Sequence, residues 1–97
     1  MPDKMPFKSD LPKPWADFLP DIDGPDNDER TAAIRTVMVS SYLHRPEALA
    51  HLADDGKLEQ IMDWARQAEP FRADALRTLS PQDLQWLRDG GFIRVGE

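Results

Sequence analysis

The stretch that decides the fold is NDERTAAIRTVMVSSYLHR, residues 27–45, which lies within the chain's longest run free of proline and glycine. Its apolar and small side chains recur at i, i+3, i+4, i+7 and i+8, the spacing of one helical face: Ile34, Val37, Met38, Ser41 and Tyr42. Val39 and Leu43 widen that face, so this helix should be enclosed on more than one side. We therefore expect residues 27–45 to form a central helix against which the rest of the chain packs.

The ends of this helix carry the residues that helix ends favour. Asp26 can cap the first turn, with Glu29 three residues later. His44 and Arg45 stand in the last turn, where positive charge suits the helix dipole.

Two shorter helices are predicted next, in residues 46–54 and 57–69. Pro46 can occupy the first helical position of the former, and Gly56 can end it. The latter has the helical stripe Leu58, Ile61, Met62, Ala65 and Ala68, with Trp64 at its margin. Pro70 is expected to end it.

Two more helices follow in residues 71–79 and 81–89. Phe71, Ala75 and Leu79 stand at i, i+4 and i+8 in the first of these. Ser80 should cap the second, with Pro81 at its first position and Leu79 and Leu84 forming a hydrophobic staple. Gly90 and Gly91 should stop it, and residues 92–95 are expected to be extended.

The sequence thus predicts an all-α fold, a small bundle of four to five short helices in a domain of residues 27–97. A short strand-like tail ends the chain. Residues 1–26 are predicted to form an extended, acidic arm, because they hold six of the nine prolines.

One short turn of this arm, residues 14–19, carries an apolar cluster. Trp15, Phe18 and Leu19 stand at i, i+3 and i+4 and would share a face. Two hypotheses stay open: the cluster covers the domain's own core, or it docks in a groove of a partner. In the second case the arm's acids would steer it toward a basic groove, and the candidate binding residues are Trp15, Asp17, Phe18, Leu19, Asp21 and Asp23.

Charge and composition limit the function. Residues 1–30 carry four bases and eight acids, a net charge of −4, and residues 31–97 carry eight bases and ten acids, a net charge of −2. A nucleic-acid binder concentrates positive charge on one face, so no direct nucleic-acid binding is expected.

The chain has no cysteine for a disulfide or a thiolate metal site. It also has no apolar run long enough for a membrane span, which predicts a cytoplasmic protein with no membrane contact. Arginine outnumbers lysine eight to four, which suggests a bacterial or phage source.

Motifs for catalysis or metal binding are incomplete. His44, His51 and Asp54 could approach one another but make a partial ligand set. The acidic residues 21–29 fail the spacing of a calcium loop. Ser40 and Ser41 have no histidine at a suitable local spacing to activate them. No catalytic residues, metal or cofactor are therefore predicted, and we expect no enzyme.

These observations predict a non-catalytic interaction protein that binds, and regulates or inhibits, a larger protein or complex, as an accessory subunit or a phage-type inhibitor. Its oligomeric state is left open. The alternative is a winged-helix-like DNA-binding regulator, since a capped helix, a Gly-Gly stop and an apolar tail succeed one another in residues 80–95. In that case the supposed recognition helix would carry Asp83 and Asp89 toward phosphates that repel them.

Overall fold

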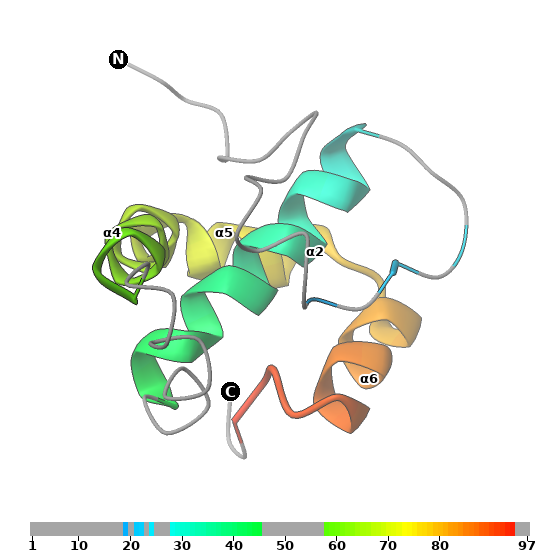
Figure 1. Ribbon diagram of the computed structural model, residues 1–97. Coiled ribbons are helices and arrows are strands. Elements are labelled where there is room, and N and C mark those ends of the chain that lie inside the picture. Colours follow the sequence, from blue (N-terminus) through cyan, green and yellow to red (C-terminus); the bar gives the residue numbers. More distant parts are fainter. Residues whose placement is uncertain (1–18, 20, 23, 25–27, 46–57, 95–97) are drawn as a thin grey trace.

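The computed structural model describes residues 19, 21–22, 24, 28–45 and 58–94. Figure 1 shows their helical elements, which are α2 (Asp28–Ser41), η1 (Tyr42–His44), α4 (Leu58–Ala68), η3 (Glu69–Phe71), α5 (Arg72–Thr78) and α6 (Pro81–Asp89). These elements join into three continuous helical segments, rather than the four to five separate helices that the sequence predicts. The Cα radius of gyration is 12.7 Å, close to the ~12.5 Å of a folded domain of this length.

Helix α2 lies at the centre, as predicted, and packs mainly against α5 and α4. Figure 1 shows α4 on one side of α2 and α6 on the other. Every residue from Thr31 to Tyr42 except Arg35 is buried. The predicted apolar face is confirmed, and the buried surface also includes Thr36 and Ser40. Because nearly all sides of α2 are covered, its polar side chains need partners inside the protein.

Helix α4 buries the stripe that the sequence predicts. Ile61, Ala65 and Ala68 are buried, while Leu58 and Met62 are half-buried against the same core. The two alanines and Ala75 of α5 have no exposed surface. Such short side chains let the helix backbones approach α2 closely.

The α-helix α4 ends at Ala68, just before Pro70, in agreement with the prediction, but the helical path does not stop there. The chain continues through the 3₁₀ turn η3, in which Pro70 stands near the start, directly into α5. Proline is accepted at the start of a helical turn because the N–H that it lacks would have no partner there. Ala75 and Leu79 are buried as predicted, but Arg72 is buried with them in place of Phe71, which is half-buried.

Helix α6 begins as predicted. The Ser80 hydroxyl accepts a hydrogen bond from the Asp83 amide at 3.2 Å, and Pro81 occupies the first turn. Leu87 faces the core, while Leu84 and Trp86 are half-buried beside it. Gly90 caps the helix end and Gly91 takes a φ of 84°, a conformation that favours glycine.

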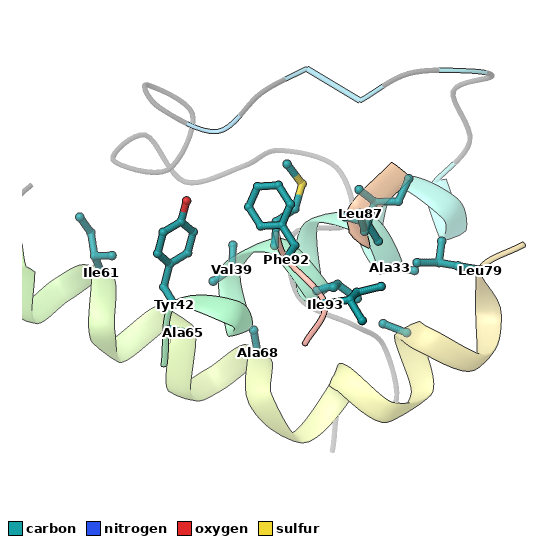
Figure 2. Close-up of a cluster of buried hydrophobic side chains, with 14 residues drawn as sticks. Ala33, Val39, Tyr42, Ile61, Ala65, Ala68, Leu79, Leu87, Phe92 and Ile93 are labelled. Carbon is teal, nitrogen blue, oxygen red and sulfur yellow. The ribbon is translucent and has the colours of Figure 1, made fainter. Parts of the chain in front are cut away.

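The predicted strand-like tail is not observed, because the described residues after α6 form bends and coil without a strand. Phe92 and Ile93 instead insert their side chains into the core, with 7% and 5% of their surface exposed (Figure 2). The Phe92 amide donates to the carbonyl of Leu87 at 2.9 Å. Side-chain burial, rather than strand pairing, therefore fixes this segment.

Several predictions fall outside the described residues. These are the helix in residues 46–54, the Asp26 cap and the short turn in residues 14–19, apart from Leu19. Of the arm, the structure describes Leu19, Asp21, Ile22 and Gly24.

Candidate functional site

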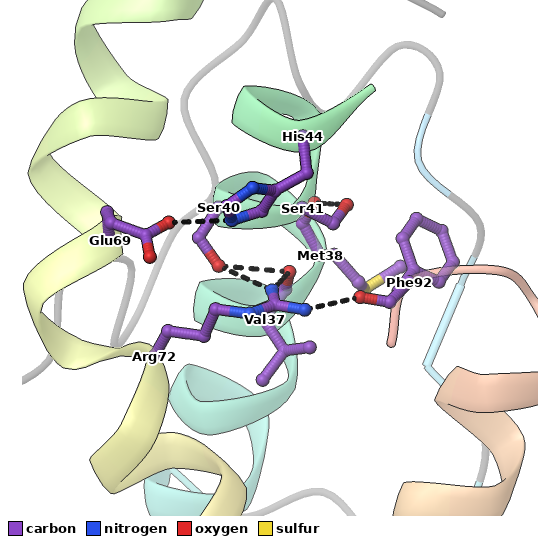
Figure 3. Close-up of polar contacts among 8 residues, drawn as sticks. All are labelled: Val37, Met38, Ser40, Ser41, His44, Glu69, Arg72 and Phe92. Atoms are coloured by element: carbon purple, nitrogen blue, oxygen red, sulfur yellow. Dashed lines mark hydrogen bonds and ion pairs between the residues drawn. The ribbon is translucent and has the colours of Figure 1, made fainter. Parts of the chain in front are cut away.

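The most elaborate polar site in the described residues surrounds Arg72 (Figure 3). Its Nη1 donates to the Val37 carbonyl at 2.9 Å and to the Ser40 hydroxyl at 2.8 Å. Its Nη2 donates to the Phe92 carbonyl at 2.8 Å. Arg72 is only 4% exposed. One buried guanidinium thus joins α5, α2 and the C-terminal segment, using the several donors that only arginine offers.

Arg72 was not among the functional residues predicted from the sequence. A usable signal was its spacing of three and seven residues from Ala75 and Leu79, which are both buried. An arginine in an otherwise apolar stripe indicates a buried cation that needs internal acceptors. The polar positions Ser40 and Ser41 on the opposing central helix were a second signal.

The two serines are committed to the structure of α2. Ser40 Oγ donates to the Val37 carbonyl at 3.2 Å and accepts from Arg72, and Ser41 Oγ donates to the Met38 carbonyl at 2.6 Å. Both residues are buried. A nucleophile needs an accessible oxygen and a base to accept its proton. The hydroxyl of Ser40 instead donates a hydrogen bond to a backbone carbonyl.

His44 of η1 pairs with Glu69 of η3. The His44 Nε2 lies 3.4 Å from Glu69 Oε2, which is a buried atom with no hydrogen bond among the described residues. This places His44 beside one carboxylate. His51 and Asp54, the other members of the predicted metal cluster, lie outside the described residues. No group of three metal-ligating side chains occurs within the described ranges.

A second polar site links the start of α2 to the start of α6. Arg30 Nε and Nη2 donate to the two carboxylate oxygens of Asp83 at 3.0 and 2.8 Å. This bidentate contact with Arg30 lowers the pKa of Asp83, and the Ser80 hydroxyl acts in the same direction, while burial opposes both. The pair is largely covered, with 17% and 13% of the two side chains exposed. Charge-assisted bidentate pairs are among the stronger polar contacts in proteins.

The described residues of the arm contact the core and, at Gly24, this second site. Leu19 and Ile22 are half-buried against the core cluster, whereas Asp21 between them is exposed. Gly24 has a φ of 94°, and a side-chain carbon at this position would come within 2.8 Å of Arg30 Nη2. A guanidinium thus stands beside Gly24, where its charge is unfavourable for a bound cation.

The other predicted binding residues are placed as follows. Leu19 contacts the chain's own core, which agrees with the hypothesis of a covering arm for this residue. Asp21 faces solvent. Trp15, Asp17, Phe18 and Asp23 lie outside the described residues.

The C-terminal segment is held by a second arginine. Arg45 Nη1 donates to the Gly91 carbonyl at 2.9 Å, and its guanidinium carbon lies 5.8 Å from the centre of the Tyr42 ring. The rings of Tyr42 and Phe92 meet edge to face at 6.4 Å. Burial raises the pKa of Tyr42, and the charge of Arg45 opposes this effect. The arrangement differs from a wing that projects beside a recognition helix, since Phe92 and Ile93 point into the core.

None of the helices in the described ranges is both long and apolar enough to traverse a lipid bilayer. Comparison with known proteins gives no match: no protein-family model, no curated protein and no solved structure corresponds to the chain. A functional proposal must therefore rest on the residues and geometry of this chain.

Proposed function

We propose that this chain is a non-catalytic interaction protein whose acidic N-terminal arm binds a basic surface of a larger protein or complex. Binding regulates or inhibits that partner. The residues assigned to the contact are Trp15, Asp17, Phe18, Leu19, Asp21 and Asp23. In this proposal the chain acts in the cytoplasm of a bacterium, as an accessory subunit or as a phage-encoded inhibitor.

The observation that carries the proposal is the alternation within the arm. Leu19 and Ile22 are half-buried on the core, while Asp21 between them is exposed. The covered surface of these two side chains holds the arm against the domain, while Asp21 and the part of Leu19 that stays exposed are left for a partner. Because the arm is already attached in this way, less conformational freedom is lost when its carboxylates bind a partner.

The uneven charge of the chain supports a basic partner. The net charge of −4 in residues 1–30 is twice that of the remaining 67 residues. Opposite charges across an interface accelerate association and favour the correct partner. Tryptophan is also enriched among residues that dominate binding energies.

The polar contacts of the helical domain support a non-catalytic role. The buried hydroxyl of Ser40 and the guanidinium of Arg72 bind one another and backbone carbonyls. The carboxylate of Asp83 is engaged by Arg30. These groups hold elements of the domain together.

The test is affinity capture with a matched set of variants. The tagged full chain is incubated with host lysate, and retained proteins are identified by mass spectrometry. We expect wild type to retain one larger partner with a basic surface and the double variant Trp15→Ala, Phe18→Ala to lose it. The control Phe71→Ala truncates a half-buried aromatic of η3 and should retain the partner.

Melting temperatures of the three proteins separate binding from folding. The double variant should melt within a few degrees of wild type, because anchors that face a partner contribute little to folding. Equal capture by wild type and the double variant would contradict the proposal. A large loss of stability in the double variant would also contradict it, because the two aromatics would then belong to the domain's own core.

A further inference from the structure

Residues 90–94, the C-terminal strap, lie across the core without belonging to a helix or a strand. Two arginines from different elements hold consecutive carbonyls of this strap: Arg45 binds Gly91 at 2.9 Å, and Arg72 binds Phe92 at 2.8 Å. The side chains of Phe92 and Ile93 fill the space beneath. The strap thus resembles a short peptide ligand that remains covalently attached to its own binding site.

The strap has a hinge at its start. Gly90 and Gly91 are both exposed, and Gly91 already takes a φ of 84°. Glycine reaches a wide range of backbone angles at little energetic cost. Rotation at this pair would move Phe92 and Ile93 as a unit while leaving α6 intact.

The two arginine contacts differ in how much they resist opening. The contact of Arg45 with Gly91 is exposed to solvent, where water can replace either partner. The contact of Arg72 with Phe92 is buried. Arg72 nevertheless keeps the Val37 carbonyl and the Ser40 hydroxyl as acceptors when the strap leaves. Opening of the strap therefore leaves the Arg72 guanidinium with two acceptors. It avoids the usual free-energy cost of such a break, which is a buried charge without a partner.

We propose that residues 90–94 form a strap that opens locally about Gly90 and Gly91, without unfolding of the helices, and that its opening uncovers the Tyr42 ring and the Arg72 guanidinium. The closed strap covers this ring through the edge-to-face contact of Phe92 with Tyr42. The strap thereby controls access to the Tyr42 ring and to the Arg72 guanidinium. It is separate from the arm and does not depend on the function proposed for the arm.

Amide hydrogen exchange of the full chain tests this directly. The Phe92 amide, bonded to the Leu87 carbonyl, reports opening of the strap. The Met38 amide, in the buried middle of α2, reports unfolding of the helical core. Local opening predicts that Phe92 exchanges at least about 100-fold faster than Met38, after correction for intrinsic rates.

Two variants separate local from global opening. Met62→Ala weakens the packing of α4 on the core. It should accelerate exchange at Met38 about tenfold and leave Phe92 unchanged. Arg45→Gln removes the outer contact of the strap and should accelerate exchange at Phe92 about threefold.

The single tyrosine of the chain gives a second readout. The rate at which tetranitromethane nitrates Tyr42 should be the same in wild type and Met62→Ala, because this rate depends on opening of the strap and not on the packing of α4. Equal exchange at Phe92 and Met38, or a parallel rise at both amides in Met62→Ala, would overturn the proposal. An Arg45→Gln protein with unchanged exchange at Phe92 would also overturn it, because the arginine contacts would then not hold the strap.

Discussion

The guanidinium of Arg72 lies 2.8 Å from the main-chain carbonyl oxygen of Phe92, a residue 20 positions further along the chain. The same side chain reaches Val37, 35 positions earlier. Three segments that are far apart in sequence therefore meet at one buried cation. The acceptors of Val37, Ser40 and Phe92 are neutral oxygens, so these three contacts are hydrogen bonds and not ion pairs.

Replacing Arg72 should destabilise the domain. In Arg72→Met, the buried Phe92 carbonyl loses the arginine donor, and the Val37 carbonyl keeps only the weaker contact with the Ser40 hydroxyl, so we expect the free energy of unfolding to fall by about 3 kcal/mol. Arg66→Met, at an exposed position of α4, should change it by less than about 0.5 kcal/mol. Urea denaturation followed by circular dichroism measures both values. An Arg72→Met protein as stable as wild type would show that the Arg72 contacts contribute nothing net to stability.

The Asp83 carboxylate should make stability depend on pH. The contact with Arg30 lowers the pKa of folded Asp83 below its ordinary value of 3.8. The folded state therefore binds fewer protons than the unfolded state near that pH, and the stabilisation is fully present above it. The contribution should be lost as the pH falls below 3.8 toward the lower folded value.

Melting curves of wild type and Asp83→Asn between pH 2 and 7 measure this effect. We expect a constant difference in stability above about pH 5, and a difference that shrinks as the solution becomes more acidic. Arg88→Gln, at an exposed position of α6, should keep the pH profile of wild type. A difference between wild type and Asp83→Asn that stays constant down to pH 2 would contradict the assignment.

Two substitutions at the junction between α5 and α6 should lower the free energy of unfolding by different amounts. Leu79 is 7% exposed, and Leu79→Ala should lower the free energy of unfolding by about 2–5 kcal/mol. Ser80→Ala removes the cap that accepts from the Asp83 amide, and the loss should be about 1 kcal/mol. Denaturant midpoints give both values. If Ser80→Ala proved more damaging than Leu79→Ala, the order of these two contributions would be wrong.

The parts of the fold that the sequence predicted are those with local signals. The period of residues 27–45 identified α2, and Ser80 with Pro81 identified the start of α6. Pro70 correctly indicated the end of α4, but it did not reveal the 3₁₀ turn that leads on into α5, because a proline can either end a helix or begin a turn and the packing of the residues around it decides. The position of Phe92 depends on contacts with Tyr42 and Arg72, which are distant in sequence, so a local pattern could indicate only an extended segment.

The candidate sites were less predictable for the same reason. Neither the contact of Arg30 with Asp83, 53 residues apart, nor that of Arg45 with Gly91, 46 residues apart, follows from spacing along the chain. The assignment of Trp15, Phe18 and Leu19 to a partner rests on composition and helical spacing and stays a prediction. The half-burial of Leu19 adds that at least one of these side chains contacts the domain itself.

The central claim is that the acids of the arm bind a basic partner, and the affinity of the captured partner for a charge variant tests it most directly. Asp17, Asp21 and Asp23 are replaced together by asparagine. The control replaces three exposed acids of α4 and α5 in the same way, as Glu59→Gln, Asp63→Asn and Asp74→Asn. Calorimetry at low and at physiological salt gives each dissociation constant. We predict that the arm variant binds about tenfold more weakly at low salt and loses most of its salt dependence, while the control binds as wild type does. Equal affinities for wild type and the arm variant at both salt concentrations would contradict the account.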